Sequence, residues 1–177
     1  MLRVPRAPAS PPLFDSLEQE AYLQLWRTYD RLREIDERLF AGHGITAQQY
    51  NALRVLKAAR PGALSASALG ARLVSRAADI TRLLDRLERL GLVQRRRNDR
   101  NRRAVEVSIT PAGVALVGRL AAAVRRCGRD QLGHLDQRSL RQLVALLERA
   151  RAPHEGEGGP AAWPARAARM PARRPPR

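Results

Sequence analysis

The feature that most constrains the fold is a change of hydrophobic period in the middle of the chain. Ile80, Leu84, Leu87 and Leu90 first recur at the 3.6-residue spacing of an amphipathic helix. Gly91 ends this helix. An extended stretch opens at Leu92, and apolar residues alternate with polar ones over 105–109, the two-residue period of a strand. A Thr-Pro pair at 110–111 begins a further helix. The pattern predicts a helix, a β-hairpin with a basic loop over 94–103, and another helix.

Helical periodicity also dominates the segment before this change. Residues 17–39 carry apolar side chains three or four positions apart, and His43-Gly44 ends that helix. Thr46 and Gln49 have the spacing of a capping box, in which each side chain bonds the backbone N–H of the other residue. A second helix therefore begins there, and it stops before Pro61.

A short third helix and the start of a fourth follow closely. Ser65 is the predicted cap of the third helix, which ends near Val74, and Ser75 is the predicted cap of the fourth. A very short strand is expected near 63–64. After the hairpin and a long helix, Asp136 caps a last helix, whose apolar face at helical spacing is Leu140, Leu143, Val144 and Leu147. The predicted fold class is mainly α with a small β-hairpin.

The net charge of the chain restricts its partners. Basic residues outnumber acidic ones by 33 to 17, and the net charge of +16 favours a polyanion, either nucleic acid or an anionic membrane surface. No run of about eighteen apolar residues is present, so no membrane-spanning helix is predicted. Cys127 is the only cysteine and the three histidines are scattered, so we expect neither a disulfide nor a metal or other cofactor. A reducing, cytoplasmic location is expected.

Composition divides the chain into a folded part and two tails. Residues 1–14 are rich in proline, and residues 152–177 are rich in proline, glycine, alanine and arginine. Neither segment can bury enough apolar area to offset its chain entropy, so we expect both to be disordered and the C-terminal one to be basic. The predicted domain is 15–151, with a central part at 45–110 between helical segments at 15–42 and 111–151.

The third and fourth helices and the hairpin together match a winged helix-turn-helix. In this arrangement the first helix of the pair braces the second, whose N-terminal turns enter the major groove of double-stranded DNA. Free N–H groups at the start of the third helix make Ser65 and Ser67 candidate phosphate contacts. The candidate DNA contacts on the fourth helix are Ser75, Arg76, Ala78, Asp79, Thr81, Arg82 and Arg86.

Arginine is concentrated in the predicted hairpin loop. Residues 95–103 contain six arginines against a single acidic residue, Asp99. Such a hairpin can follow a phosphate backbone or enter a narrow minor groove. The alternative for any one of these arginines, Arg95 and Arg96 included, is a solvated surface charge that does not contact DNA. The candidate DNA contacts in the hairpin are Arg97, Arg100, Asn101, Arg102 and Arg103.

The run ITRLLDRLERLGLVQRRR, followed by RRAVEVSITPAG, resembles the recognition helix and wing of the MarR family of transcriptional regulators. That family commonly shows a TRLVDRLE-type helix, then GLV, an acidic-Arg-Arg turn and a closing LTPAG. The resemblance extends over about residues 17–150, and it implies a homodimer that places a winged helix-turn-helix between dimerisation helices. It assigns recognition-helix positions to Ser75, Arg76, Thr81 and Arg82, and wing positions to Arg102 and Arg103.

The chain departs from the family pattern in the wing. Asn101 stands where the family usually has aspartate, and Ile109 stands where it usually has leucine. An Asp–Arg pair that would stiffen the wing is then missing, or Asp99 supplies it.

The resemblance also implies a small aromatic effector, since some members bind phenolic compounds. Tyr22, Trp26 and Tyr29 would border a pocket between the dimerisation helices and the winged part, with interface core as the alternative role. Cys127 has arginine neighbours that would lower the pKa of an exposed thiol, but a packed, inert thiol is the preferred interpretation.

These features together predict a function without catalysis. No nucleophile motif, phosphate loop or metal spacing is present, so no enzymatic activity is expected. The predicted function is a sequence-specific transcriptional regulator, a repressor that binds an inverted repeat as a homodimer and is released by a small ligand. The alternative is a sequence-tolerant architectural DNA-binding protein. The uncharged candidates Ser75, Ala78 and Thr81 argue against it, because phosphate binding needs only charge.

Overall fold

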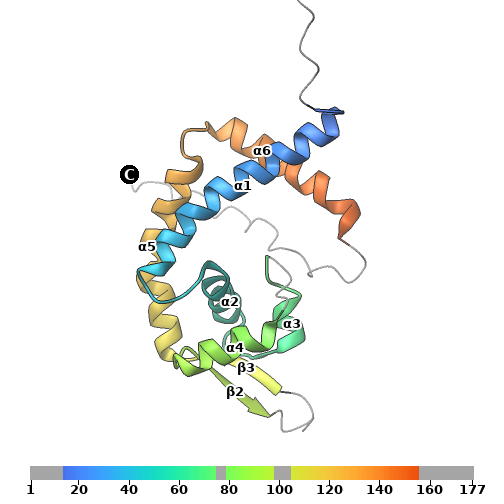
Figure 1. Cartoon of the computed structure of the whole chain (residues 1–177). Helices are drawn as coiled ribbons and strands as arrows, with labels where there is room; N and C mark the ends of the chain where they lie inside the picture. Colours follow the sequence, from blue (N-terminus) through green and yellow to red (C-terminus); the bar gives the residue numbers. More distant parts are fainter. Residues whose placement is uncertain (1–13, 75–78, 98–104, 156–177) are drawn as a thin grey trace, which may run out of the picture.

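The helices and strands follow the predicted order along the chain (Figure 1). The structure is a computed structural model, and it describes residues 14–74, 79–97 and 105–155. The helices are α1 (Leu17–Ala41), α2 (Ala47–Ala58), α3 (Ala66–Gly70), α4 (Ile80–Arg89), α5 (Pro111–Leu132) and α6 (Gln137–Arg151). The strands are β1 (Leu64–Ser65), β2 (Val93–Arg97) and β3 (Val105–Ile109). The mainly helical fold class with a small sheet is confirmed.

Side-chain caps set the starts of most helices, as predicted. The Thr46 hydroxyl accepts from Gln49 N at 3.1 Å while Gln49 Oε1 accepts from Thr46 N at 2.9 Å, which completes the capping box of α2. Ser65 caps α3, Thr110 caps α5 and Asp136 caps α6, each accepting from the amide three residues on. These helix starts are therefore decided by interactions within one turn of sequence.

The start of α4 differs from the prediction. Asp79, rather than Ser75, is its cap, because the Asp79 carboxylate accepts from Arg82 N at 2.9 Å. Ser75 itself lies outside the described residues. The third helix is also shorter than expected: α3 ends at Gly70, and turns continue the chain to Val74. The turn predicted at Val74–Ser75 between the two helices is therefore misplaced, because α3 ends at Gly70 and α4 begins at Ile80.

The three strands form one antiparallel sheet in the order β1-β3-β2. Val93 pairs with Ile109 and Arg97 with Val105, so residues 94–97, which we expected in the loop, belong to β2. Polar residues can occupy β2 because hydrogen bonds to β3 satisfy the backbone N–H and C=O groups, whichever side chains the strand carries. The predicted alternation of β3 is confirmed at its C-terminal end, where Val107 and Ile109 are buried and Ser108 between them is half-buried, but Val105 is 43% exposed.

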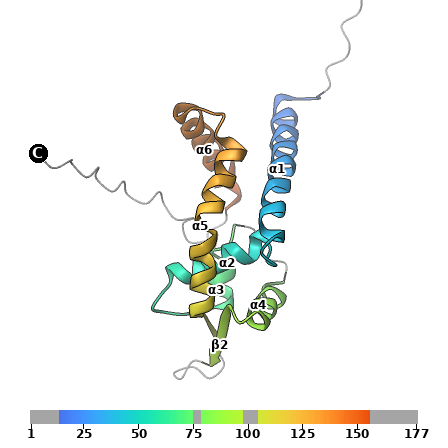
Figure 2. The same cartoon turned by 90° about the vertical axis from the view of Figure 1, so that its left-hand side faces the viewer.

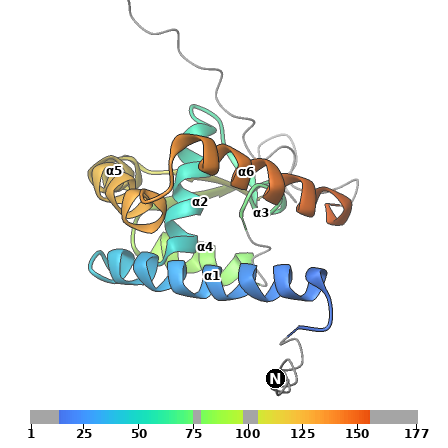
Figure 3. The same cartoon turned by 90° about the horizontal axis from the view of Figure 1, so that it is seen from above.

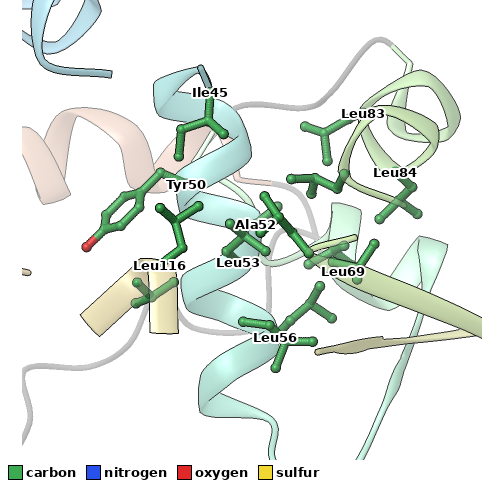
Figure 4. Close-up of a cluster of buried hydrophobic side chains, with 14 of the residues drawn as sticks. Ile45, Tyr50, Ala52, Leu53, Leu56, Leu69, Leu83, Leu84 and Leu116 are labelled. Carbon is green, nitrogen blue, oxygen red and sulfur yellow. The ribbon is translucent and has the colours of Figure 1, made fainter. Parts of the chain in front are cut away.

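The hydrophobic core lies around α2 (Figure 4). Side chains of α2, among them Leu53 and Leu56, pack against Leu69 of α3, Leu84 of α4 and Leu116 of α5. The buried face of α4 differs in part from the expected one, because it consists of Leu83, Leu84 and Leu87. Leu90, at the C-cap of α4, is 46% exposed and so lies outside this buried face.

Helices α1 and α5 each have one end in this core and extend away from it, and α6 follows α5. The C-terminal part of α1 packs along α5, and Gln131 Nε2 of α5 donates to Leu32 O of α1 at 3.1 Å. The N-terminal part of α1 and all of α6 extend beyond the winged part and lie apart from each other in both views (Figures 2 and 3). No residue of α6 is buried, so its predicted apolar face is not covered within the chain.

The ends of the chain fall mostly outside the described residues. The expected N-terminal tail is described only at Phe14. The expected C-terminal tail differs at its start, because residues 152–154 form a 3-10 turn, η1 (Ala152–His154), directly after α6. Within the described residues, no helix is both long enough and apolar enough to span a membrane.

Candidate DNA-binding site

The candidate reading surface is the outward side of α4. Leu83, Leu84 and Leu87 are buried on the inner side of the helix and fix its orientation against the core. Thr81, Arg82 and Arg86, three of the predicted contacts, are exposed on the other side. A helix held by leucines with polar side chains outward is the geometry that major-groove recognition requires.

Arg82 is the most accessible of these arginines with a defined partner. Its side chain is 88% exposed, and its Nε lies 2.9 Å from Asp79 Oδ2. Exposed ion pairs of this kind contribute little stability, so the guanidinium can exchange Asp79 for DNA at low cost. Asp79 is a predicted DNA contact, but the structure gives it a local role, because it caps α4 and orients Arg82.

The start of α3 presents the two predicted phosphate contacts. Ser65 Oγ accepts from Ala68 N at 3.1 Å and lies 3.0 Å from Ser67 Oγ, so Ser65 is engaged in capping. Ser67 is exposed. Because α3 has only five residues, its aligned peptide dipoles are few, and the anion-binding contribution of this helix end is smaller than for a long helix.

Several predicted contacts lie outside the described residues. Of the predicted hairpin contacts, Arg97 is the last residue of β2. The remaining ones in that segment are Arg100, Asn101, Arg102 and Arg103, and those before α4 are Ser75, Arg76 and Ala78. Their assignment to DNA, and that of Asp99 to an ion pair in the wing, stays a prediction.

The position of Arg95 differs from the one expected from the sequence. The sequence groups it with the loop arginines, but it lies in β2 and its side chain turns toward α4, where Nη1 is 2.6 Å from Asp85 Oδ1. Only 25% of the side chain is exposed. The available signal was the strand alternation, which puts Arg95 on the same face as the buried Val93.

The three aromatic residues predicted to bind a ligand are exposed on α1. Tyr22, Trp26 and Tyr29 are 62%, 60% and 63% exposed, and the rings of Tyr22 and Trp26 have centroids 6.2 Å apart. A hollow of about 540 Å³ includes Trp26 but neither tyrosine among its lining residues, which come only from Phe14 and α1. The expected pocket against the winged part is therefore not formed by these three residues within the chain.

Cys127 is a packed thiol, as preferred from the sequence. It is buried between α5 and α1, and its Sγ donates to Asp36 Oδ1 at 3.3 Å. Burial and the hydrogen bond to Asp36 raise the pKa of Cys127 to about 11. The idea that neighbouring arginines would lower this pKa is wrong, because the nearest partner of the thiol is a carboxylate.

Comparisons with known proteins agree with this geometry. A family model described as the MarR family matches residues 43–104. The HTH-type transcriptional repressor YetL of Bacillus subtilis is 32% identical over 101 residues, which cover 57% of this chain and only 60% of YetL. A MarR transcription factor from Planctomyces limnophilus is 49% identical with a TM-score of 0.61, and the alignment covers 77% of this chain and 98% of that one.

A third comparison is with BpsR of Bordetella bronchiseptica, whose DNA binding is regulated by 6-hydroxynicotinic acid. Its structure aligns with a TM-score of 0.68 at 24% identity over 79% of this chain and 97% of BpsR, and so shows the shared fold. The likeness to the Planctomyces protein is stronger, because it combines the fold with high identity over nearly all of that protein. This chain belongs to the MarR family of winged-helix transcriptional regulators.

Proposed function

We propose that this regulator is a homodimeric repressor that binds an inverted-repeat operator through α4 and the wing. The observation that carries the proposal is the two-sided character of α4. Leucines anchor its inner side, while Thr81, Arg82 and Arg86 project from its outer side next to a two-stranded wing rich in arginine. A surface that combines hydroxyl and guanidinium groups can read base edges as well as phosphates. Repression is the direction suggested by the relative YetL, a transcriptional repressor.

Exposed apolar surface on α1 and α6 supports the homodimer. Leu17, Trp26 and Tyr29 of α1 are 60% or more exposed, and Val144 and Leu146 of α6 are more than half exposed. Monomers rarely expose contiguous apolar patches of this kind, and a two-fold pairing of the same elements would cover both helices. In this proposal residues 15–42 and 111–151 dimerise, 45–110 bind DNA, and 1–14 and 152–177 are tails.

A small aromatic acid is the proposed effector. BpsR, which shares the fold, responds to 6-hydroxynicotinic acid. In this chain the hollow of about 540 Å³ beside Trp26 also presents Arg27, whose guanidinium suits a carboxylate. The regulator acts by binding in the cytoplasm rather than by catalysis.

Operator spacing tests the proposal. The full-length chain is used to select duplexes from a random library, and the selected site is compared with a scrambled duplex of the same composition. Two-fold dimers place their recognition helices about one helical turn apart, so we expect half-sites centred about 10 bp apart. Inserting five base pairs between them turns one half-site to the opposite side of the duplex and should abolish tight binding. Unchanged affinity after the insertion would refute the binding of a dimer to an inverted repeat.

The main alternative is a sequence-tolerant architectural role. It predicts that selection yields no common site and that the scrambled duplex binds as tightly as the selected one. The net charge of +16 suits that role. However, binding to phosphates alone needs only charge, so it would not require the fixed orientation that the buried leucines give α4.

A further inference from the structure

We propose that Arg95 is a positioning residue that holds the recognition helix α4 at a fixed angle to the wing, and that sequence discrimination by this regulator depends on it. The inference rests on the proposed sequence-specific function and deepens it. It assigns to one arginine of the basic hairpin a task different from that of its neighbours, because its charge is used inside the protein and is not available to DNA.

Arg95 contacts three acceptors along one side of α4. Its Nη1 lies 2.6 Å from Asp85 Oδ1, its Nε lies 3.7 Å from Glu88 Oε2, and its Nη2 donates to the Thr81 carbonyl at 3.2 Å. The acceptors are four and three residues apart, which is the spacing of residues on one helix face. One planar guanidinium therefore spans two turns of α4, and a rotation or a slide of the helix would break at least one contact.

The backbone of β2 adds a fourth link at the same place. The Arg95 amide donates to Glu88 Oε1 at 3.1 Å. Because β2 is an edge strand, amides on its outer side receive no partner from the sheet, and Glu88 supplies one. Glu88 thus binds both the main chain and the side chain of Arg95, which ties the strand itself to the helix.

Arg95 and Arg96 are neighbours with opposite surroundings. The Arg95 side chain is 25% exposed and faces α4, whereas Arg96, on the other face of β2, is exposed. Both carry the same charge, so removal of either lowers the net charge of the hairpin equally. Any difference between the two variants therefore reports geometry rather than bulk charge.

The position of Thr81 explains why DNA reading would be affected. Thr81 presents its carbonyl to Arg95 and lies in the exposed first turn of α4, one residue before Arg82. A shift of α4 relative to the wing would move these groups away from the base edges while leaving nonspecific phosphate contacts possible. A lysine at position 95 could not replace the arginine fully, because an ammonium is a point charge without the planar fork.

The test compares Arg95→Met with the matched control Arg96→Met, both in the full-length chain. The probes are the duplex selected by the wild-type protein and its scrambled counterpart, titrated over a range of salt. We expect Arg95→Met to bind the selected duplex about tenfold more weakly and the scrambled duplex almost as before. The dependence of log affinity on log salt concentration should keep the wild-type slope. Arg96→Met should leave the ratio of the two affinities unchanged.

Two results would overturn the proposal. A salt slope that becomes shallower by about 0.9 in Arg95→Met would mean that Arg95 neutralises a phosphate. Equal losses on both duplexes leave the ratio of the two affinities unchanged, and would mean that Arg95 has no part in discrimination. If the wild-type chain itself does not distinguish the two duplexes, the proposed function fails, whatever Arg95 does.

The acceptor side gives an independent check. Asp85→Ala should reproduce part of the loss of discrimination, and the double variant of Asp85→Ala with Arg95→Met should be no worse than Arg95→Met alone, because Arg95→Met already removes the contact to Asp85. Arg95→Lys should recover only part of the discrimination. Additive losses in the double variant would show that the two residues act separately and would contradict the proposal.

Discussion

Gly113 should be the residue of α5 least able to accept a side chain. It occupies the first turn of the helix, directly beneath the point where the wing returns to the core. A Cβ on Gly113 would lie 2.7 Å from Ile109 Cγ1 and still closer to the carbonyl oxygen of Leu92, well inside the 3.0 Å that real Cβ atoms almost never go below. That carbonyl cannot move freely, because it accepts from Thr110 N at 3.1 Å. The Gly113→Ala substitution therefore forces α5 away from the start of β2.

The magnitude follows from two opposed effects. Replacing glycine by alanine is favourable by about 1 kcal/mol in a helix interior, and by at most that in the first turn, where Gly113 lies. Overpacking typically costs about 1–3 kcal/mol, and a clash with a bonded backbone carbonyl belongs at the upper end of that range. We therefore expect a net loss of about 2 kcal/mol in the free energy of unfolding. A Cβ on Gly118, in the same helix, would have no neighbour within 4 Å outside the helix's own backbone, so Gly118→Ala should instead stabilise the protein by up to about 1 kcal/mol.

Differential scanning calorimetry at one protein concentration measures both variants. For a chain of this size each 1 kcal/mol corresponds to roughly 2–4 °C, so Gly113→Ala should lower Tm by about 4–8 °C and Gly118→Ala should raise it by a few degrees. Chemical denaturation should give the same order of stability. If both substitutions shift Tm in the same direction, the close approach of Gly113 to Leu92 is not what determines the response, and the reasoning is refuted.

Three further predictions concern DNA, the dimer and the thiol. Arg82→Ala should weaken binding to the selected duplex by about 1–3 kcal/mol and relax preference at one base position; a uniform loss on all sequences would make Arg82 a phosphate contact instead. Trp26→Glu puts a charge on the exposed apolar side of α1 and should shift sedimentation toward the monomer, whereas an unchanged dimer would place the interface elsewhere. Because its pKa is raised to about 11, Cys127 should resist alkylation at pH 8 in the native protein and react only after unfolding, and rapid labelling of the native protein would contradict this. The raised pKa also means that the free energy of unfolding falls as pH rises from about 9 to 11.

Local interactions explain which parts of the structure could be predicted. The capping box of Thr46 and Gln49 and the Thr110 cap involve residues three apart, so they are written in the sequence itself. The strand period of 105–109 and the C-terminal glycine of α4, Gly91 with φ +67°, are local in the same sense. These signals sufficed for the order of elements and for the winged helix-turn-helix.

Contacts between distant segments decided the rest. The sequence places Arg95 in a loop because its partners Asp85 and Glu88 belong to another element, and the pairing exists only once β2 lies against α4. Asp36 and Cys127 are 91 positions apart, so the sequence around the cysteine gave no sign of the carboxylate that raises its pKa. Helical periodicity likewise shows which side of α1 or α6 is apolar, but only the tertiary structure shows that the chain leaves these sides uncovered. The physical reason is the same in each case, since burial and electrostatic environment are properties of neighbours in space rather than neighbours in sequence.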